Sequence, residues 1–180
     1  LSSEVLDQQP PERLAFLLHT SVLDRFSAPL CNAVLDRFDA AVELAELERL
    51  TGFLVPLDRH RAWFRYHHLF RDVLRAALTR SEPRLANALH ERASRWFEEH
   101  DLPAEAIEHF QQAIKLEPDA EGYVNLLGAY AYCGRRDEAI VRLCRQATLL
   151  DPNYADAWAL MGLAQLELRF WHGKDEDALD

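Results

Sequence analysis

The chain has 180 residues, of which 49% are apolar, and its 30 acidic and 20 basic side chains give a formal net charge of −10. This composition suits one or two globular domains and excludes a disordered or collagen-like chain. Uninterrupted apolar runs of about 18 residues and a basic-then-apolar leader are both missing, so we expect no membrane span, no signal peptide and a cytoplasmic location. We also expect the chain to be a fragment of a longer protein.

The charge is spread unevenly along the chain. Residues 1–86 carry twelve acidic side chains against eleven arginines, whereas residues 87–180 carry eighteen acidic against nine basic ones. This asymmetry predicts two different domains. The acidic second half would repel phosphate backbones, which argues against extensive nucleic-acid binding there.

The first half predicts helices followed by a hairpin. Helices are expected at Pro11–Thr20, from Pro29 to about Leu35, and over an apolar-periodic run that Asp39 caps and Gly52 ends. The segments "FLVPL" and "AWFRYH", joined by a polar turn at 58–61, predict two strands, and a helix is expected from His68 to Thr79. Helices, a hairpin and a further helix predict a winged-helix-like domain over residues 1–86.

The second half repeats with a period of 34 residues. Three pairs show this spacing: Pro118 and Pro152, Ala113 and Ala147, and Gly128 and Gly162. The period divides the chain into units 87–120, 121–154 and an incomplete 155–180. The fold class expected for the whole chain is therefore mainly α, a winged-helix-like domain with a small β-hairpin followed by an α-solenoid.

Each repeat unit predicts a pair of helices. In the first, "ALHERASRWFEEH" forms one helix, and Asp101 is expected to cap the next, "AEAIEHFQQAIKL". The small residues Ser94, Gly128 and Gly162 are expected to let paired helices approach closely. The terminal "DEDALD" predicts the opening of a further helix. An incomplete last pair predicts exposed apolar surface and some self-association, over Trp158, Leu163, Leu166, Phe170 and Trp171.

The stretch "RHRAWFRYHHLFRDVLR" (59–75) could be a nucleic-acid grip, a metal or catalytic site, or a structural element. As a strand it places Phe64 and Tyr66 on one face and Trp63, Arg65 and His67 on the other, with one set packed and the other solvated. Adjacent histidines on a helix diverge by about 100°, which argues against a shared metal ion. The near-neutral charge of the first half argues against direct DNA contact.

Catalytic and metal-binding motifs give no match. The sequence contains no GxxxxGK[ST] phosphate loop, no HExxH helix and no GxSxG elbow, so we predict no catalytic residue, no metal ligand and no cofactor in this chain. The three cysteines, Cys31, Cys133 and Cys144, form no CxxC pair and are expected to be buried, reduced thiols.

Two family resemblances follow from these segments. "RLAFLLHTSVLDRFSAPLCNAVL", "LERLTGFLVPLD" and "WFRYHHLFRDVLRAAL" resemble the winged-helix region of MalT-like regulators, LuxR-type transcription activators of the STAND class. "AEAIEHFQQAIKLEPD" and "AWALMGLAQL" resemble tetratricopeptide repeats. The resemblance implies a parent with an upstream ATPase module that uses ATP or ADP and a downstream DNA-reading module, both partners of this bacterial segment.

The resemblance also implies site residues. His67 or His68 would approach the phosphates of ADP; the alternative is that one packs at the junction between hairpin and helix while the other is solvated. A repeat groove for a protein or small effector, basic or apolar in character, would use Glu91, Arg95, Glu98, Glu99, Asn125, Ala129, Tyr132, Ala159, Leu163 and Leu166.

Three functions remain open from sequence alone. The first is a noncatalytic regulatory segment that relays nucleotide state to a helical sensor. The second is a free-standing adaptor that binds a peptide partner through its repeats. The third is a DNA-binding winged helix.

Overall fold

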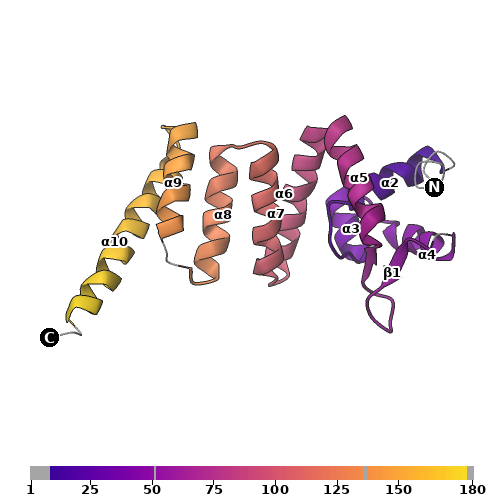
Figure 1. Cartoon of the computed structure of the whole chain (residues 1–180), viewed down its shortest axis with the longest axis horizontal. Helices are drawn as coiled ribbons and strands as arrows, with labels where there is room; N and C mark the ends of the chain where they lie inside the picture. The colour runs from indigo at the N-terminus through magenta and orange to yellow at the C-terminus, as the bar shows by residue number, and fades with distance from the viewer. Residues whose placement is uncertain (1–8, 51, 136–137, 178–180) are drawn as a thin grey trace. The chain divides into compact units, whose positions relative to one another are not determined.

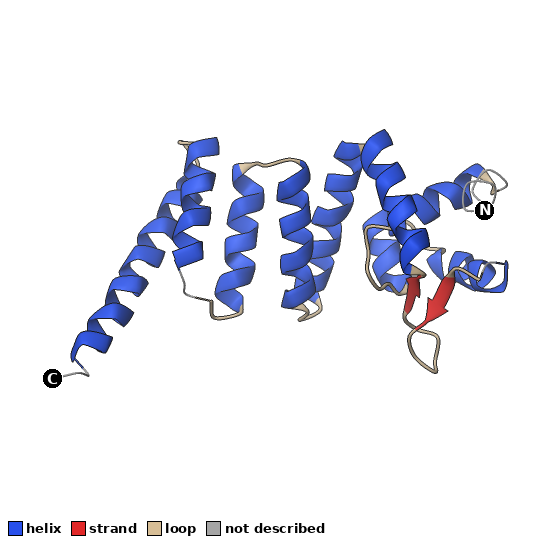
Figure 2. Cartoon of the chain, viewed as in Figure 1, coloured by secondary structure: helices blue, strands red, loops and turns tan. Residues whose placement is uncertain are grey.

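The computed structural model describes residues 9–50, 52–135 and 138–177, with side chains described as far as Glu167. These residues are mainly α-helical with one small antiparallel hairpin in the described part, as predicted (Figure 2). The chain separates into two compact units, Leu1–Trp96 and Phe97–Asp180. The boundary predicted after residue 86 falls, like this one, within a helix, and it stays a prediction.

The described residues of the first unit form helices α2 to α5, the hairpin and most of α6 (Figure 1). In chain order they are α2 (Pro11–Thr20), α3 (Ala28–Leu35), α4 (Ala40–Leu50), β1 (Leu54–Pro56), β2 (Phe64–Tyr66), α5 (His68–Ser81) and α6 (Pro83–Glu99). The predicted α2 and α3 are confirmed to within one residue, and α5 runs two residues past its predicted end. Local chemistry explains the starts, because α2 has a proline in its first turn and Ser27 accepts a hydrogen bond from Leu30 N at the start of α3.

The core of this unit joins the helices to the hairpin. Helix α2 packs on α3 and α5, and α4 packs on α3 and β1. Phe26, between α2 and α3, exchanges two backbone hydrogen bonds of 2.8 Å with Phe64, so β2 is bonded on both sides. Full burial of such side chains stabilises the fold by about 1.5–3 kcal/mol each. The largest fully buried ones are Phe16, Leu23, Phe26, Leu30, Leu47, Leu74, Leu78 and Leu89.

The second unit is built from successive helices that pack on their neighbours. They are α7 (Pro103–Leu116), α8 (Ala120–Tyr132), α9 (Glu138–Leu150) and α10 (Ala155–Asp177), and α10 contacts both α9 and α8. Figure 1 shows α7, α8 and α9 side by side with alternating direction. Ala113 and Ala147, one period apart, are both buried, as are Ala120 and Ala157. These small side chains allow the close packing that a helical repeat needs.

The ends of α6 and α8 share one conformation. Leu102 N bonds to Phe97 O at 2.9 Å after α6, and Arg135 N bonds to Tyr130 O at 3.0 Å after α8. The residues that make the turn, Asp101 and Gly134, have φ of 55° and 70°, so each helix ends in a Schellman motif. The predicted capping role of Asp101 is therefore wrong: Asp101 ends α6 in the left-handed conformation that aspartate tolerates, and the N-cap of α7 is Leu102, which makes no side-chain cap bond.

Two predictions about the repeats are corrected. A Cβ placed on Gly128 or Gly162 would meet nothing within 4 Å, so neither glycine is needed for close helix packing. The further helix predicted to open at "DEDALD" does not form as a separate element within the described residues, because α10 continues to Asp177.

The predicted apolar face on α10 is exposed where the structure describes it. Trp158, Leu163 and Leu166 are 49%, 59% and 66% exposed, while the side chains of Phe170 and Trp171 lie outside the described ones. Self-association through this face stays a prediction. Within the described chain, no helix is both long and apolar enough to cross a membrane.

Candidate functional site

The strand β2 holds the start of α5 in place. Phe64 and Tyr66 are buried while Arg65 and His67 are exposed, which confirms the predicted alternation for these four residues, whereas Trp63, grouped with Arg65 and His67, is half-buried. The Tyr66 ring lies 4.8 Å from that of Phe26 and 5.7 Å from that of Phe70. Its hydroxyl lies 2.7 Å from Thr20 Oγ1 on α2, and burial raises the pKa of Tyr66 far above its ordinary value. The last residue of β2 is therefore a fixed, neutral anchor.

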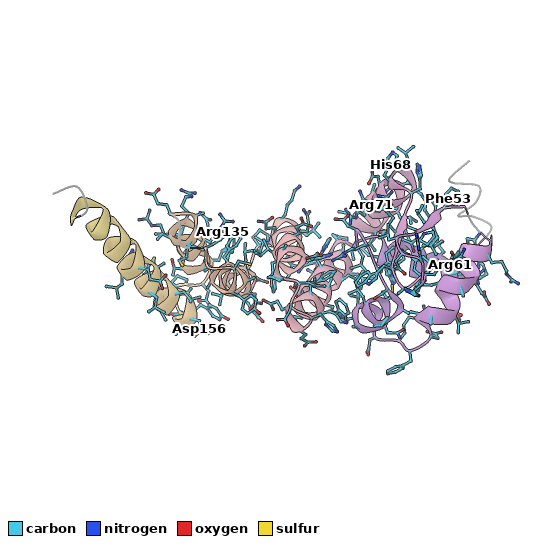
Figure 3. The ribbon with its side chains drawn as sticks, turned by 90° about the horizontal axis from the view of Figure 1, so that it is seen from below. Phe53, Arg61, His68, Arg71, Arg135 and Asp156 are labelled. Carbon is cyan, nitrogen blue, oxygen red and sulfur yellow. The ribbon has the colours of Figure 1, made fainter. Side chains whose placement is uncertain are left out.

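His67 and His68 lie side by side at the start of α5. His67 is the N-cap residue, outside the helix, and its amide donates to Phe53 O at 2.8 Å. The two ring centroids are 4.5 Å apart with an interplanar angle of 33°. Both residues are exposed, and Figure 3 shows His68 at the periphery of the first unit.

This arrangement overturns two sequence-based interpretations. The rings do not diverge, because His67 precedes the helix and does not follow its 100° rotation per residue. The alternative in which one histidine packs at the junction is also wrong, because both are exposed. Two adjacent imidazoles beside a helix N-terminus can donate hydrogen bonds to an anion.

Most arginines of the 59–75 stretch have partners inside the protein. Arg75 Nε donates to Ser21 O at 2.6 Å and its Nη2 donates to Val22 O at 2.7 Å. Arg71 and Arg75 both reach Asp24 Oδ1, at 2.6 and 3.0 Å. These bonds tie α5 to the chain that follows α2.

The hairpin turn has its own network. The carboxylate of Asp58 accepts from the amides of His60, Ala62 and Trp63 at 2.8, 3.2 and 2.7 Å. These bonds, that of Trp63 foremost, lower the pKa of Asp58. Arg61 pairs with Glu48 at 2.9 Å, so three of the five arginines in the stretch are ion-paired or hydrogen-bonded within the protein. Fewer of them are available to phosphates.

Three predicted groove residues lie together in the second unit. A pocket of about 180 Å³ is lined by Glu98, Pro103, Gly128, Ala129 and Tyr132. Glu98 comes from the end of α6, Pro103 opens α7, and the other three lie on α8. The structure therefore brings Glu98, Ala129 and Tyr132 into one site.

The remaining predicted groove residues are not part of this pocket. Glu91 and Arg95 belong to the first unit, where they approach to 3.8 Å as an i,i+4 pair. Asn125 is half-buried on α8. Leu163 and Leu166 are exposed on α10.

Asp101 is bonded to Tyr132 of this pocket, a contact that the sequence did not reveal. Tyr132 Oη donates to Asp101 Oδ1 at 2.9 Å, which raises the pKa of Tyr132. The sequence signal was misleading, because an aspartate two residues before Pro103 is typical of a helix cap. Its left-handed backbone instead turns it back toward α8.

The described part of the chain contains no cluster of cysteines or of metal-binding side chains. Cys31 and Cys144 are buried as predicted, and burial raises the pKa of Cys31 to about 12. Cys133 is exposed, so the prediction of burial is wrong for this residue. Among the described residues, no three His, Cys, Asp or Glu side chains gather as metal ligands would.

Comparison with known proteins supports the first unit's assignment. A family model described as the MalT winged helix domain matches residues 2–86. The serine/threonine-protein kinase PknK of Mycobacterium tuberculosis (strain H37Rv) is 37% identical over 109 residues, or 61% of this chain and 10% of the kinase.

Two HTH-type transcriptional regulators named MalT are also similar. The Vibrio campbellii protein is 34% identical over 113 residues, covering 63% of this chain and 12% of its own. The Vibrio cholerae protein is 30% identical over 132 residues, which cover 73% of this chain and 14% of that protein. The chain spans no more than about a seventh of the length of these relatives. The family model and these similarities identify residues 2–86 as a MalT-like winged-helix region.

Proposed function

We propose that this chain is a noncatalytic regulatory segment of a larger nucleotide-dependent regulator. The winged-helix region, residues 1–86, relays the nucleotide state of an upstream ATPase module. The tetratricopeptide-like helices of residues 87–180 bind a protein or small effector. The observation that carries the proposal is the adjacent, exposed pair His67 and His68 at the start of α5, inside the MalT-like region.

The relatives support a relay role over a dedicated output. The same region of this chain is similar to a protein kinase and to transcriptional regulators. These proteins carry different activities in their names, so the shared segment is best assigned to control that precedes the output. In this protein, transcription regulation would then depend on a separate DNA-reading module.

The histidine pair suits contact with the phosphates of ADP. An imidazole N–H of each can donate a hydrogen bond to a charged phosphate oxygen, and the N-terminus of α5 adds a favourable partial charge. Because His67 N is bonded to Phe53 O and Tyr66 is anchored to α2, the rings are held at a fixed edge of the unit. When the nucleotide dissociates, the histidines would lose their contact with its phosphates, and the core of the unit would not need to rearrange.

ADP retention by the intact parent tests this role. Variants His67→Gln and His68→Gln are expected to weaken ADP binding by tenfold or more together, because each charged hydrogen bond contributes about 1.5–3 kcal/mol. His60→Gln, an exposed histidine in the hairpin turn, is the matched control and should retain wild-type affinity. Unchanged ADP affinity in the double variant would reject the proposal.

DNA binding by the winged helix is the less favoured alternative. The partners of Arg61, Arg71 and Arg75 reduce the number of cations free for phosphates. A gel shift of duplex DNA by this chain at about 50 mM salt, lost at about 200 mM, would favour the alternative. The relay proposal expects no shift.

A further inference from the structure

The pocket in the second unit is too small for a nucleotide or a drug-sized effector. Its volume is about 180 Å³, below the roughly 300–1,000 Å³ of most small-molecule sites. That volume suits one long side chain. Of the five lining residues, Pro103 and Ala129 offer only carbon from their side chains and Gly128 has no side chain, so this part of the pocket suits an aliphatic stem.

Gly128 keeps this pocket open at a cost to helix stability. It lies within the 13-residue helix α8, where glycine is less stable than alanine by roughly 0.5–1 kcal/mol. Packing does not demand it, because an added Cβ would meet nothing within 4 Å. Because Gly128 lines the pocket, the absence of a side chain leaves room for a ligand to approach the helix backbone.

The charges around the pocket select a cation. Glu98 lines it, and Tyr132, which also lines it, donates a hydrogen bond to Asp101 Oδ1. Residues 97–180 carry seventeen acidic and seven basic side chains, which strengthens the negative field. An anionic ligand is disfavoured by this field.

The exposed ring of Tyr132 favours arginine among cations. The residue is 70% exposed and lines the pocket, so its ring is accessible to a guanidinium group. Guanidinium stacks on aromatic rings and bonds carboxylates in a fork, whereas ammonium does neither as well. The second unit already shows this pairing, since Arg135 lies 4.3 Å over the ring of Tyr130.

We propose that this pocket binds an arginine side chain presented by a peptide partner, its stem on Gly128 and Pro103 and its guanidinium between Glu98, Asp101 and the Tyr132 ring. The inference rests on the proposed binding function of the helical repeats and names the ligand class. It does not depend on nucleotide or on His67 and His68.

Chemical-shift titration of the 180-residue chain with short peptides tests the proposal. The probe is the capped tripeptide acetyl-Ala-Arg-Ala-amide, and the comparison peptide carries Glu in place of Arg. The arginine peptide is expected to shift the amides of Gly128 and Ala129 and to saturate at about millimolar concentration, while the glutamate peptide has no such effect.

Matched variants separate pocket binding from general charge attraction. Gly128→Leu fills the pocket and should abolish the shifts, whereas Gly162→Leu makes the same change one period later, also in open space, and should leave them intact. Glu98→Gln should weaken binding about fivefold, the value of one exposed ion pair. Equal shifts with both peptides, no saturable shift, or full binding by Gly128→Leu overturns the proposal. ADP retention in the parent is measured separately, so either proposal can fail alone.

Discussion

The hydrogen bond between Thr20 and Tyr66 offers a quantitative test of how β2 is held. Thr20 Oγ1 donates to Phe16 O at 2.6 Å, so its oxygen accepts from Tyr66 Oη at 2.7 Å. Thr20 is fully buried and Tyr66 is 3% exposed. Thr20→Val leaves the tyrosine hydroxyl buried without its acceptor, at about 1–3 kcal/mol, whereas Tyr66→Phe leaves Thr20 bonded to Phe16 and costs about 0.5–1.5 kcal/mol.

The double variant Thr20→Val/Tyr66→Phe removes both polar groups and should cost less than the two single changes added, with a coupling of about 1 kcal/mol. Native-state hydrogen exchange of the amides of Phe26 and Phe64, which bond to each other's carbonyls, measures the free energy of opening. Thr79→Val on the exposed face of α5 is the control and should change it by less than about 0.5 kcal/mol. Equal costs for the two single variants, or strict additivity, would refute the reasoning.

Three further predictions concern the turn, α5 and the repeats. The pKa of Asp58 is lowered in the folded state, so its contribution to stability is present above pH 3.8 and is lost as the pH falls through the folded-state pKa. The chemical shift of the Trp63 amide, which donates to Asp58, should therefore titrate below pH 3.8. In Asp58→Asn this titration should be missing. Arg75→Ala should lower the free energy of unfolding of the first unit by about 2 kcal/mol, because two backbone carbonyls lose a charged donor. Urea denaturation measures this loss, and a change below about 0.5 kcal/mol would contradict the prediction. Gly162→Ala should raise the stability of the second unit by about 0.5–1 kcal/mol in the same assay, and a loss would show that the position is packed.

Local patterns in the sequence predicted most of the fold. The alternation from Phe64 to His67 gave the buried and exposed faces of β2, because side chains on a strand point to opposite sides. Prolines in the first turn marked the starts of α2, α3 and α7. Each of these signals depends on residues that are close in sequence.

Features that depend on tertiary contact were missed or misread. The ring contact of His67 and His68 follows from where α5 begins, which a one-residue shift of the helix start would change. Asp101 was interpreted as the N-cap of α7, but its left-handed backbone ends α6 instead. Its hydrogen bond with Tyr132 joins residues 31 apart in the sequence, which a local pattern does not show. Gly128 was interpreted as a residue that allows close helix packing. The sequence shows a glycine that repeats after 34 residues, but it does not show whether a helix or open space lies next to it.

The proline in β1 has a consequence for how the protein behaves at high concentration. Leu57 N bonds to Trp63 O and His67 N to Phe53 O, so in an antiparallel ladder the amides of alternate residues face β2 and position 56 faces outward. Pro56 has no amide hydrogen to offer there, and β2 is already bonded to Phe26 on its other side. The outer edge of β1 is therefore a poor template for the addition of another strand. We expect concentrated samples to resist forming amyloid-like fibrils through this edge.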